Sequence, residues 1–143
     1  MDYSPLRYPG GKTKIAPLVN FIIEKAGIKQ GIYIEPFAGG AGVALALLLN
    51  NKVDNIVIND IDIAIYAFWY SVLNYTGEFV QLVKDTPVTI EEWRKQKGIF
   101  ISKNQENLLE LGFATFFLNR TNRSGILKAG PIGGLDQKGN YLI

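Results

Sequence analysis

Residues 31–49 read Gly-Ile-Tyr-Ile-Glu-Pro-Phe-Ala-Gly-Gly-Ala-Gly-Val-Ala-Leu-Ala-Leu-Leu-Leu, and this stretch decides the fold. Its opening run, 31–35, is short and rich in β-branched and aromatic residues, which favours a strand. The next segment, 36–42, carries three glycines, and 43–49 consists of apolar residues that favour a helix. We therefore predict a strand, a tight glycine turn and a helix in direct succession.

The segments on either side extend this pattern. Upstream, residues 1–12 contain two prolines and two adjacent glycines and predict a loop, and apolar residues then recur at helical spacing from Thr13 to a stop at Gly27. Downstream, a second short apolar run at 55–58 leads into a long apolar stretch at 63–73. The order helix, strand, helix, strand, helix indicates an α/β unit with parallel strands.

Composition excludes several classes of protein. The 143 residues are 48% hydrophobic with a formal net charge of +2, so we expect a real core and draw no conclusion about polyanionic partners from charge alone. The chain has no cysteine and no histidine, which excludes a Cys/His zinc site, a Ser-His-Asp triad and disulfides. No signal peptide or membrane-spanning run is recognisable, so we expect a soluble, cytoplasmic protein.

The carboxyl-terminal half has a different character. Helices are predicted at 78–84, 89–97 and 105–118, with Pro87 and Gly98 as breaks. Thr89, with a glutamate three residues later, is a candidate helix cap. From residue 119 onward glycines alternate with polar and basic residues, which predicts a loop or short hairpin. Aromatic residues at helical spacing are expected in the core: Trp93, Phe113, Phe116 and Phe117.

The glycine turn and the acid after the next strand suggest a ligand site. The glycines allow the backbone to turn tightly and a ligand to approach it closely. Alternatively, they are needed for the tight turn alone. The spacing is not Gly-x-Gly-x-x-Gly, so a ligand without a pyrophosphate fits better. Asp60 follows about 20 residues later, where nucleotide folds place an acid on ribose hydroxyls; alternatively, Asn59 and Asp60 cap the next helix. Glu35 faces either a cationic ligand or water.

Four ordered segments carry a resemblance to a known family: 7–12 (Arg-Tyr-Pro-Gly-Gly-Lys), 35–42 (Glu-Pro-Phe-Ala-Gly-Gly-Ala-Gly), 59–62 (Asn-Asp-Ile-Asp) and 117–125 (Phe-Leu-Asn-Arg-Thr-Asn-Arg-Ser-Gly). Together they resemble Dam-like, D12 class adenine-specific DNA methyltransferases. The resemblance implies an incomplete Rossmann-like fold that uses S-adenosylmethionine, with an appended helical DNA-recognition region. It places the cofactor part at 1–75 and the truncated recognition region at 76–143.

The resemblance also assigns roles in cofactor binding. It implies that Tyr8 and Lys12 contact S-adenosylmethionine, that Asp60 binds its adenosyl part and that the turn from Glu35 to Gly42 shapes the pocket. The cofactor presents a sulfonium, an amino group, a carboxylate and an adenine, which call for carboxylates, a cation and an apolar wall. The chain supplies these types of group with Tyr8, Lys12, Glu35, Phe37, Gly39 and Asp60.

Taken without the resemblance, Tyr8 is a packed loop aromatic and Lys12 a solvated residue at a helix start. Many relatives carry Trp at the position of Tyr8, and tyrosine keeps the stacking face while adding a hydroxyl.

Double-stranded DNA is the partner that the resemblance implies. The segment after residue 118 has four basic residues against one acid, and we expect Arg120, Asn122 and Arg123 to contact DNA. The alternative is a mobile polar surface loop. RNA stays open as a substrate, because similar side chains read RNA.

Catalysis requires a motif that this sequence lacks. Adenine methylation needs acceptors for the amine hydrogens and no metal; in the family an Asp-Pro-Pro-Tyr-type motif supplies them. None of the six prolines here is adjacent to another, so no catalytic residue is assigned. We expect a truncated chain, inactive alone, whose complement is a carboxyl-terminal half or a companion chain. The competing hypotheses are a non-catalytic nucleic-acid-binding fragment and a nicotinamide-dependent oxidoreductase.

Overall fold

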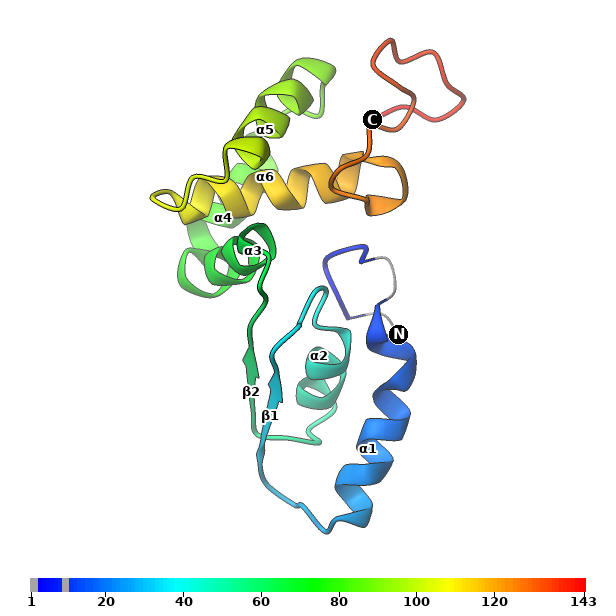
Figure 1. Cartoon of the computed structure of the whole chain (residues 1–143), viewed down its shortest axis with the longest axis vertical. Coiled ribbons are helices and arrows are strands. Elements are labelled where there is room, and N and C mark those ends of the chain that lie inside the picture. Colours follow the sequence, from blue (N-terminus) through cyan, green and yellow to red (C-terminus); the bar gives the residue numbers. More distant parts are fainter. Residues whose placement is uncertain (1–2, 9–10) are drawn as a thin grey trace. The chain divides into compact units, whose positions relative to one another are not determined.

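The computed structural model describes residues 3–8 and 11–143, and the chain divides into two units, Met1–Asp60 and Ile61–Ile143. The first unit is an α/β unit and the second is helical (Figure 1). The boundary between the units falls before the third long helix, one helix earlier than the boundary at 75/76 that the sequence suggested. The third helix belongs to the second unit because it packs along the last long helix.

The first unit contains the predicted strand, turn and helix. Its elements, in chain order, are the 3-10 helix η1 (Lys12–Ile15), helix α1 (Ala16–Lys25), strand β1 (Ile32–Glu35), helix α2 (Gly42–Leu49) and strand β2 (Asn55–Ile58). Strand β1 pairs in parallel with β2, with Ile32 opposite Asn55 and Glu35 opposite Ile58. The connection between the strands runs through α2, as a parallel pair requires. The predicted α/β unit is therefore confirmed, although the first helix begins as a 3-10 turn.

The two faces of this small sheet differ. Helices α1 and α2 lie on the same side of the strands (Figure 1). The core on that side is made of buried residues with partly buried neighbours: Ala16, Val43, Leu47 and Val53, flanked by Val19, Ile23, Tyr33, Ala46 and Ile56. On the opposite face Ile32, Ile34 and Val57 are exposed at 63%, 63% and 50%. One face of the sheet is therefore covered, and the other presents apolar side chains.

The second unit is built from four helices. These are α3 (Ile63–Asn74), α4 (Thr76–Asp85), α5 (Ile90–Ser102) and α6 (Leu108–Thr121), followed by the 3-10 turn η2 (Arg123–Gly125). The Thr89 hydroxyl accepts the Glu92 N–H at 3.1 Å, which confirms the predicted cap of α5. The predicted break at Gly98 is wrong, because α5 continues through it. A single exposed glycine costs a helix only about 1 kcal/mol, which tertiary packing offsets.

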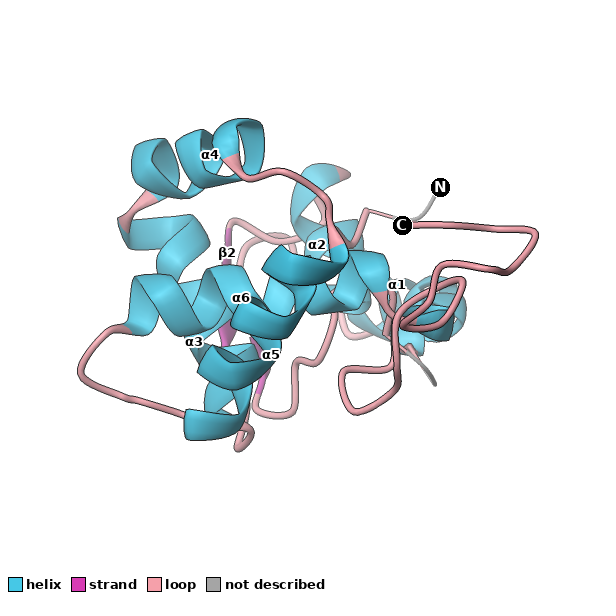
Figure 2. Ribbon diagram, turned by 90° about the horizontal axis from the view of Figure 1, so that it is seen from above, coloured by secondary structure: helices cyan, strands magenta, loops and turns pink. Residues whose placement is uncertain are grey.

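Helices α3 and α6 pack against each other at the centre of the second unit, and α5 packs against a different side of α6 (Figure 2). Gly112 permits the close approach of α6 to α3, because a Cβ there would lie 2.5 Å from the carbonyl oxygen of Ala67. The Ser71 hydroxyl ties the pair through Leu108 O at the start of α6, 2.9 Å away, and shares its hydrogen with Ala67 O within α3 itself, 2.7 Å away. The predicted aromatic residues Trp93, Phe113, Phe116 and Phe117 lie in the surrounding core, and the structure adds three more rings to it: Phe68, Trp69 and Phe79.

Candidate functional site

The glycine turn, residues 36–42, joins the end of β1 to the start of α2. Gly39 and Ala41 both have φ of 50°, in the left-handed region that glycine adopts without strain. Within the turn the Ala41 N–H donates to Ala38 O at 2.6 Å, and the Ala38 N–H donates to Asn59 O at 2.8 Å. The second of these bonds ties the turn to the residue that follows β2. The turn is thus held at the carboxyl ends of both strands.

Asp60 lies at this edge and holds the turn directly. One of its carboxylate oxygens, Oδ2, accepts the N–H of Gly39 at 2.8 Å. The cap of α3 is a different residue, because Asp62 accepts the N–H of Ala64 at 3.1 Å and stands at the N-cap. The capping alternative considered for Asp60 is therefore wrong. The carboxylate of Asp60 is half-buried beside the glycine turn.

Glu35 is the buried acid of the site. It ends β1, is 3% exposed, and its Oε2 accepts the Ala44 N–H at 3.1 Å in the first turn of α2. Helix α2 has no side-chain cap of its own at Ala41, so Glu35 takes that place and also meets the positive end of the helix dipole. The suggestion that Glu35 faces water is wrong.

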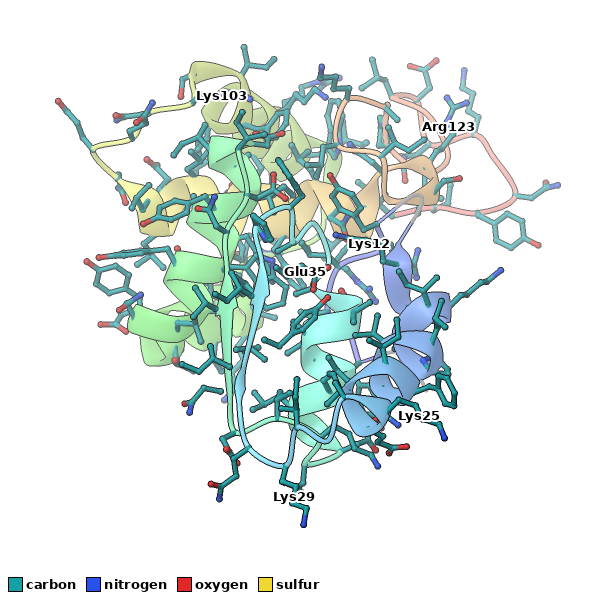
Figure 3. All side chains as sticks on the ribbon, turned by 60° about the horizontal axis from the view of Figure 1, so that its bottom comes forward. Lys12, Lys25, Lys29, Glu35, Lys103 and Arg123 are labelled. Atoms are coloured by element: carbon teal, nitrogen blue, oxygen red, sulfur yellow. The ribbon has the colours of Figure 1, made fainter. Side chains whose placement is uncertain are left out.

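Lys12 provides the counter-charge for Glu35. Its Nζ lies 2.8 Å from Glu35 Oε1, an ion pair, and donates to the backbone oxygen of Phe37 at 2.6 Å (Figure 3). The lysine side chain is 43% exposed, whereas the glutamate is enclosed. An unpaired buried carboxylate is strongly unfavourable, so this pair stabilises the end of β1. Lys12 is therefore held by the turn and is not a freely solvated residue.

Tyr8 brings an aromatic ring to the same turn. A Cβ at Gly39 would lie 2.8 Å from Tyr8 Cε1, so the ring lies directly against the glycine. Tyr8 is 41% exposed and Phe37 is 67% exposed, so both offer apolar surface beside the turn. The first unit thus brings together all six predicted cofactor residues through Gly39, Asp60 and the Lys12–Glu35 pair. Pro9 and Gly10, part of the same motif, lie outside the described residues.

The electrostatics of the site extend to Tyr33. Its pKa is raised above the ordinary tyrosine value, mainly by burial and secondarily by the negative charge of Glu35. The hydroxyl is therefore even less ionised at neutral pH than that of an ordinary tyrosine. Tyr33 contributes a neutral, partly buried ring to the covered face of the sheet.

The predicted DNA-contact residues divide into two groups. Arg120 and Arg123 are exposed, as are Lys128 and Lys138. Asn122 is fully buried: its Oδ1 accepts the Trp93 indole N–H at 2.7 Å, and its Nδ2 donates to Ile126 O and Leu127 O at 2.9 and 3.1 Å. Direct base contact by Asn122 is therefore incompatible with this conformation.

Sequence reasoning missed the partnership between Trp93 and Asn122. A core tryptophan needs an acceptor for its indole N–H, but the sequence does not identify the residue that supplies it. Lys97 was missed as well; its Nζ donates to Leu127 O at 2.9 Å.

Within residues 3–8 and 11–143, no helix is long and apolar enough to cross a membrane. Across the same residues, no group of three or more acidic, histidine or cysteine side chains is placed to hold a metal ion.

Known proteins are similar to this chain over most of its length. The family model for D12 class N6 adenine-specific DNA methyltransferases matches residues 8–138. Among curated proteins, the type II methyltransferase M.MjaIII of Methanocaldococcus jannaschii is 26% identical over 93% of this chain. The match covers 50% of that relative, so the chain spans about half of its length.

Proposed function

The chain belongs to the D12 class N6 adenine-specific DNA methyltransferase family, and on this premise we propose that it is the S-adenosylmethionine-binding part of an enzyme that methylates adenine in DNA. The observation that carries the proposal is the convergence of Tyr8, Gly39 and Asp60 with the Lys12–Glu35 pair at one edge of the sheet. In open α/β sheets, ligands bind outside the carboxyl ends of the strands.

The residues at this edge fit the chemical groups of S-adenosylmethionine. The carboxylate of Asp60 suits the ribose hydroxyls, and the rings of Tyr8 and Phe37 offer an apolar wall for adenine. A lysine ammonium has three donors, of which Phe37 O and Glu35 Oε1 account for two in this structure. We assign Lys12 to the carboxylate of the cofactor. Glu35 is 3% exposed with both oxygens engaged, so we propose that it serves the cationic end of the cofactor by its negative charge and by holding Lys12, without direct contact.

The chemistry that the cofactor supplies when bound is an electrophilic methyl group on a sulfonium. The part of this chain is to bind and orient that group, because proximity and alignment dominate such a transfer. The sequence holds no Asp-Pro-Pro-Tyr-type segment to accept the hydrogens of the adenine amine. We propose that the 143-residue chain binds cofactor without transferring methyl. Robust incorporation of labelled methyl groups into DNA by the purified chain would overturn this.

The uncovered sheet face supports a larger fold. Strands of parallel sheets are normally buried on both faces, yet Ile32, Ile34 and Val57 are at least half exposed. We propose that further strands and helices complete a Rossmann-like sheet over these residues. They would come from a carboxyl-terminal half or from a companion chain. The relative of about twice the length is consistent with such a complement.

We assign the helical unit to DNA recognition, and double-stranded DNA is the proposed partner. The exposed cations Arg120, Arg123, Lys128 and Lys138 support this assignment, since such side chains neutralise phosphates or reach guanine acceptors. We keep the division at 75/76 that the sequence suggested as the proposed functional boundary, although α3 belongs to the second structural unit.

Calorimetric titration of the chain with S-adenosylmethionine, and separately with NAD, tests the proposed cofactor. We expect binding of the former only. Asp60→Asn keeps an oxygen acceptor for the Gly39 N–H but removes the charge, and should weaken cofactor binding about tenfold, as expected for loss of a charged hydrogen bond. Asp54→Asn, at an exposed acid before β2, is the matched control. Binding of NAD alone, or equal affinities of the two variants, would contradict the assignment.

A second candidate function is a nucleic-acid-binding module without catalysis. The exposed cations and the missing catalytic segment favour it. Binding of duplex DNA measured with and without S-adenosylmethionine separates the two, because DNA binding by a module would be indifferent to the cofactor. A single-stranded RNA of equal length in the same assay tests the choice of polymer.

A further inference from the structure

The recognition loop, defined here as residues 122–132, is folded back on itself. An isolated antiparallel bridge joins Asn122 to Pro131 at its base. Beside it, the Arg123 N–H donates to Gly130 O at 3.1 Å and the Ile132 N–H donates to Thr121 O at 2.9 Å. The ends of the loop are therefore closed by backbone hydrogen bonds directly after α6.

The interior of the loop is held by its own first residue, Asn122, and by side chains from α5 and α6. Asn122 turns inward and bonds two loop carbonyls, those of Ile126 and Leu127, while accepting the indole N–H of Trp93 from α5. Asn119, also buried, donates to Gly125 O at 2.9 Å. Buried polar groups that are fully paired in this way favour one conformation over alternatives.

Lys97 completes this inner set from the next turn of α5. Its Nζ donates to Leu127 O at 2.9 Å and lies 3.5 Å from Ala129 O. The same ammonium lies 5.7 Å from the ring centroids of Trp93 and of Phe100. Burial lowers the pKa of Lys97 below the ordinary lysine value. This lysine therefore faces the loop backbone and neighbouring rings, in contrast to the exposed Lys95 on the same helix.

The outer side of the loop carries different residues. Arg123, Ser124, Ile126 and Lys128 are exposed, and Arg123 is labelled in Figure 3. Ser124 has φ of 55°, a left-handed conformation that few non-glycine residues adopt. The surrounding hydrogen bonds hold it there. The loop thus separates an inner set that fixes the backbone from an outer set that faces away from it.

We propose that Trp93, Lys97 and Asn122 are positioning residues for DNA recognition, an inference that rests on the proposed function. They order the recognition loop before DNA arrives, so that Arg123 and Lys128 meet the duplex from a fixed backbone. Ordering a backbone costs conformational entropy at every residue, and a loop ordered in advance does not incur that cost on binding. The three residues act through the loop and do not touch DNA.

The test compares two lysine variants that remove the same charge from α5. Lys97→Met removes the donor to the loop, and Lys95→Met removes an exposed charge that pairs with Glu92 on α5 itself. Hydrogen exchange of the loop amides and affinity for a mixed-sequence duplex are measured for both, with Lys97→Arg as the conservative replacement. For Lys97→Met we expect faster exchange confined to the loop and DNA affinity about fivefold to tenfold weaker than that of Lys95→Met. Lys97→Arg should restore most of the affinity.

The salt dependence of binding separates loop ordering from direct contact between Lys97 and a DNA phosphate, because only loss of a phosphate contact lowers the slope. Loop ordering does not alter the number of phosphates neutralised, so the slope of log affinity against log salt should match between Lys97→Met and Lys95→Met. Trp93→Phe, which keeps a ring and removes the indole N–H, should reproduce the loss of affinity with the slope of the wild type.

Two results overturn the proposal in distinguishable ways. If the wild-type chain binds DNA and Lys97→Met binds as tightly as Lys95→Met, the positioning role is wrong while the proposed function stands. If the wild-type chain does not bind duplex DNA at all, the assignment of this unit to DNA recognition fails, and the positioning role fails with it.

Discussion

The glycine turn at 36–42 and the recognition loop at 122–132 are held in opposite ways. The turn is tied by charged groups, the Lys12–Glu35 pair and Asp60, and these are the same groups proposed to bind the cofactor. The recognition loop is tied by an indole, two amides and one lysine that face inward, while its proposed DNA-contact residues face outward.

This difference has a consequence for binding. In the turn, a ligand must share or displace contacts that already stabilise the fold, so binding and stability are coupled. In the loop, the residues that fix the backbone and the residues that meet the ligand are separate. Substitutions should therefore separate folding from binding in the loop and fail to separate them in the turn.

Gly39→Ala should have the largest effect. The new Cβ would lie 2.8 Å from the ring of Tyr8, and φ of 50° is strained for alanine. Left-handed backbone alone costs a non-glycine residue about 1–2 kcal/mol, so thermal unfolding should shift down markedly and cofactor binding should be lost in calorimetry. Gly130→Ala in the recognition loop is the control, because its Cβ meets nothing within 4 Å. Equal effects of the two substitutions would contradict the comparison.

Lys12→Met should have the next largest effect. It leaves the buried Glu35 carboxylate without its counter-charge, and we expect a loss of about 1–3 kcal/mol in the free energy of unfolding together with weaker cofactor binding. The double variant Lys12→Met with Glu35→Gln removes the unpaired charge as well. Urea unfolding should then return toward the wild-type value, while cofactor binding stays weak. Recovery of both properties would show that Lys12 does not meet the cofactor.

Arg123→Ala should have the smallest effect on the fold, because the side chain is exposed. If it contacts a phosphate, the slope of log affinity against log salt should fall by about 1 without a change in thermal unfolding. Lys84→Ala, at an exposed position near the end of α4, should leave that slope unchanged. A fall in stability with an unaltered slope would place Arg123 with the inner residues of the loop.

The sequence predicted most of the first unit. The short β-branched and aromatic run, the glycine turn and the apolar helical run after it are local signals, and they yield the parallel pair and the convergence of Gly39 with Asp60 at one edge. The cap at Thr89 is equally local. Each of these features depends on neighbours in the chain or on the known geometry of a parallel crossover.

The second unit was less predictable because long-range packing decides it. The indole of Trp93 and the amide of Asn122 are 29 residues apart in sequence, and nothing in either local segment shows that they meet. Gly98 was predicted to end a helix on propensity, which packing of α5 on α6 overrides. The polar character of Asn122 suggested an outward side chain, whereas the loop needs inward donors and acceptors for its own carbonyls.

Hydrogen exchange of the wild-type chain with each ligand in turn tests the division of roles most directly. We predict that S-adenosylmethionine slows exchange of the amides at 38–44 and leaves 122–132 unchanged. We predict that duplex DNA protects the second unit around 120–128 and leaves the glycine turn unchanged. Protection of the recognition loop by S-adenosylmethionine, with no change at 38–44, would contradict the account.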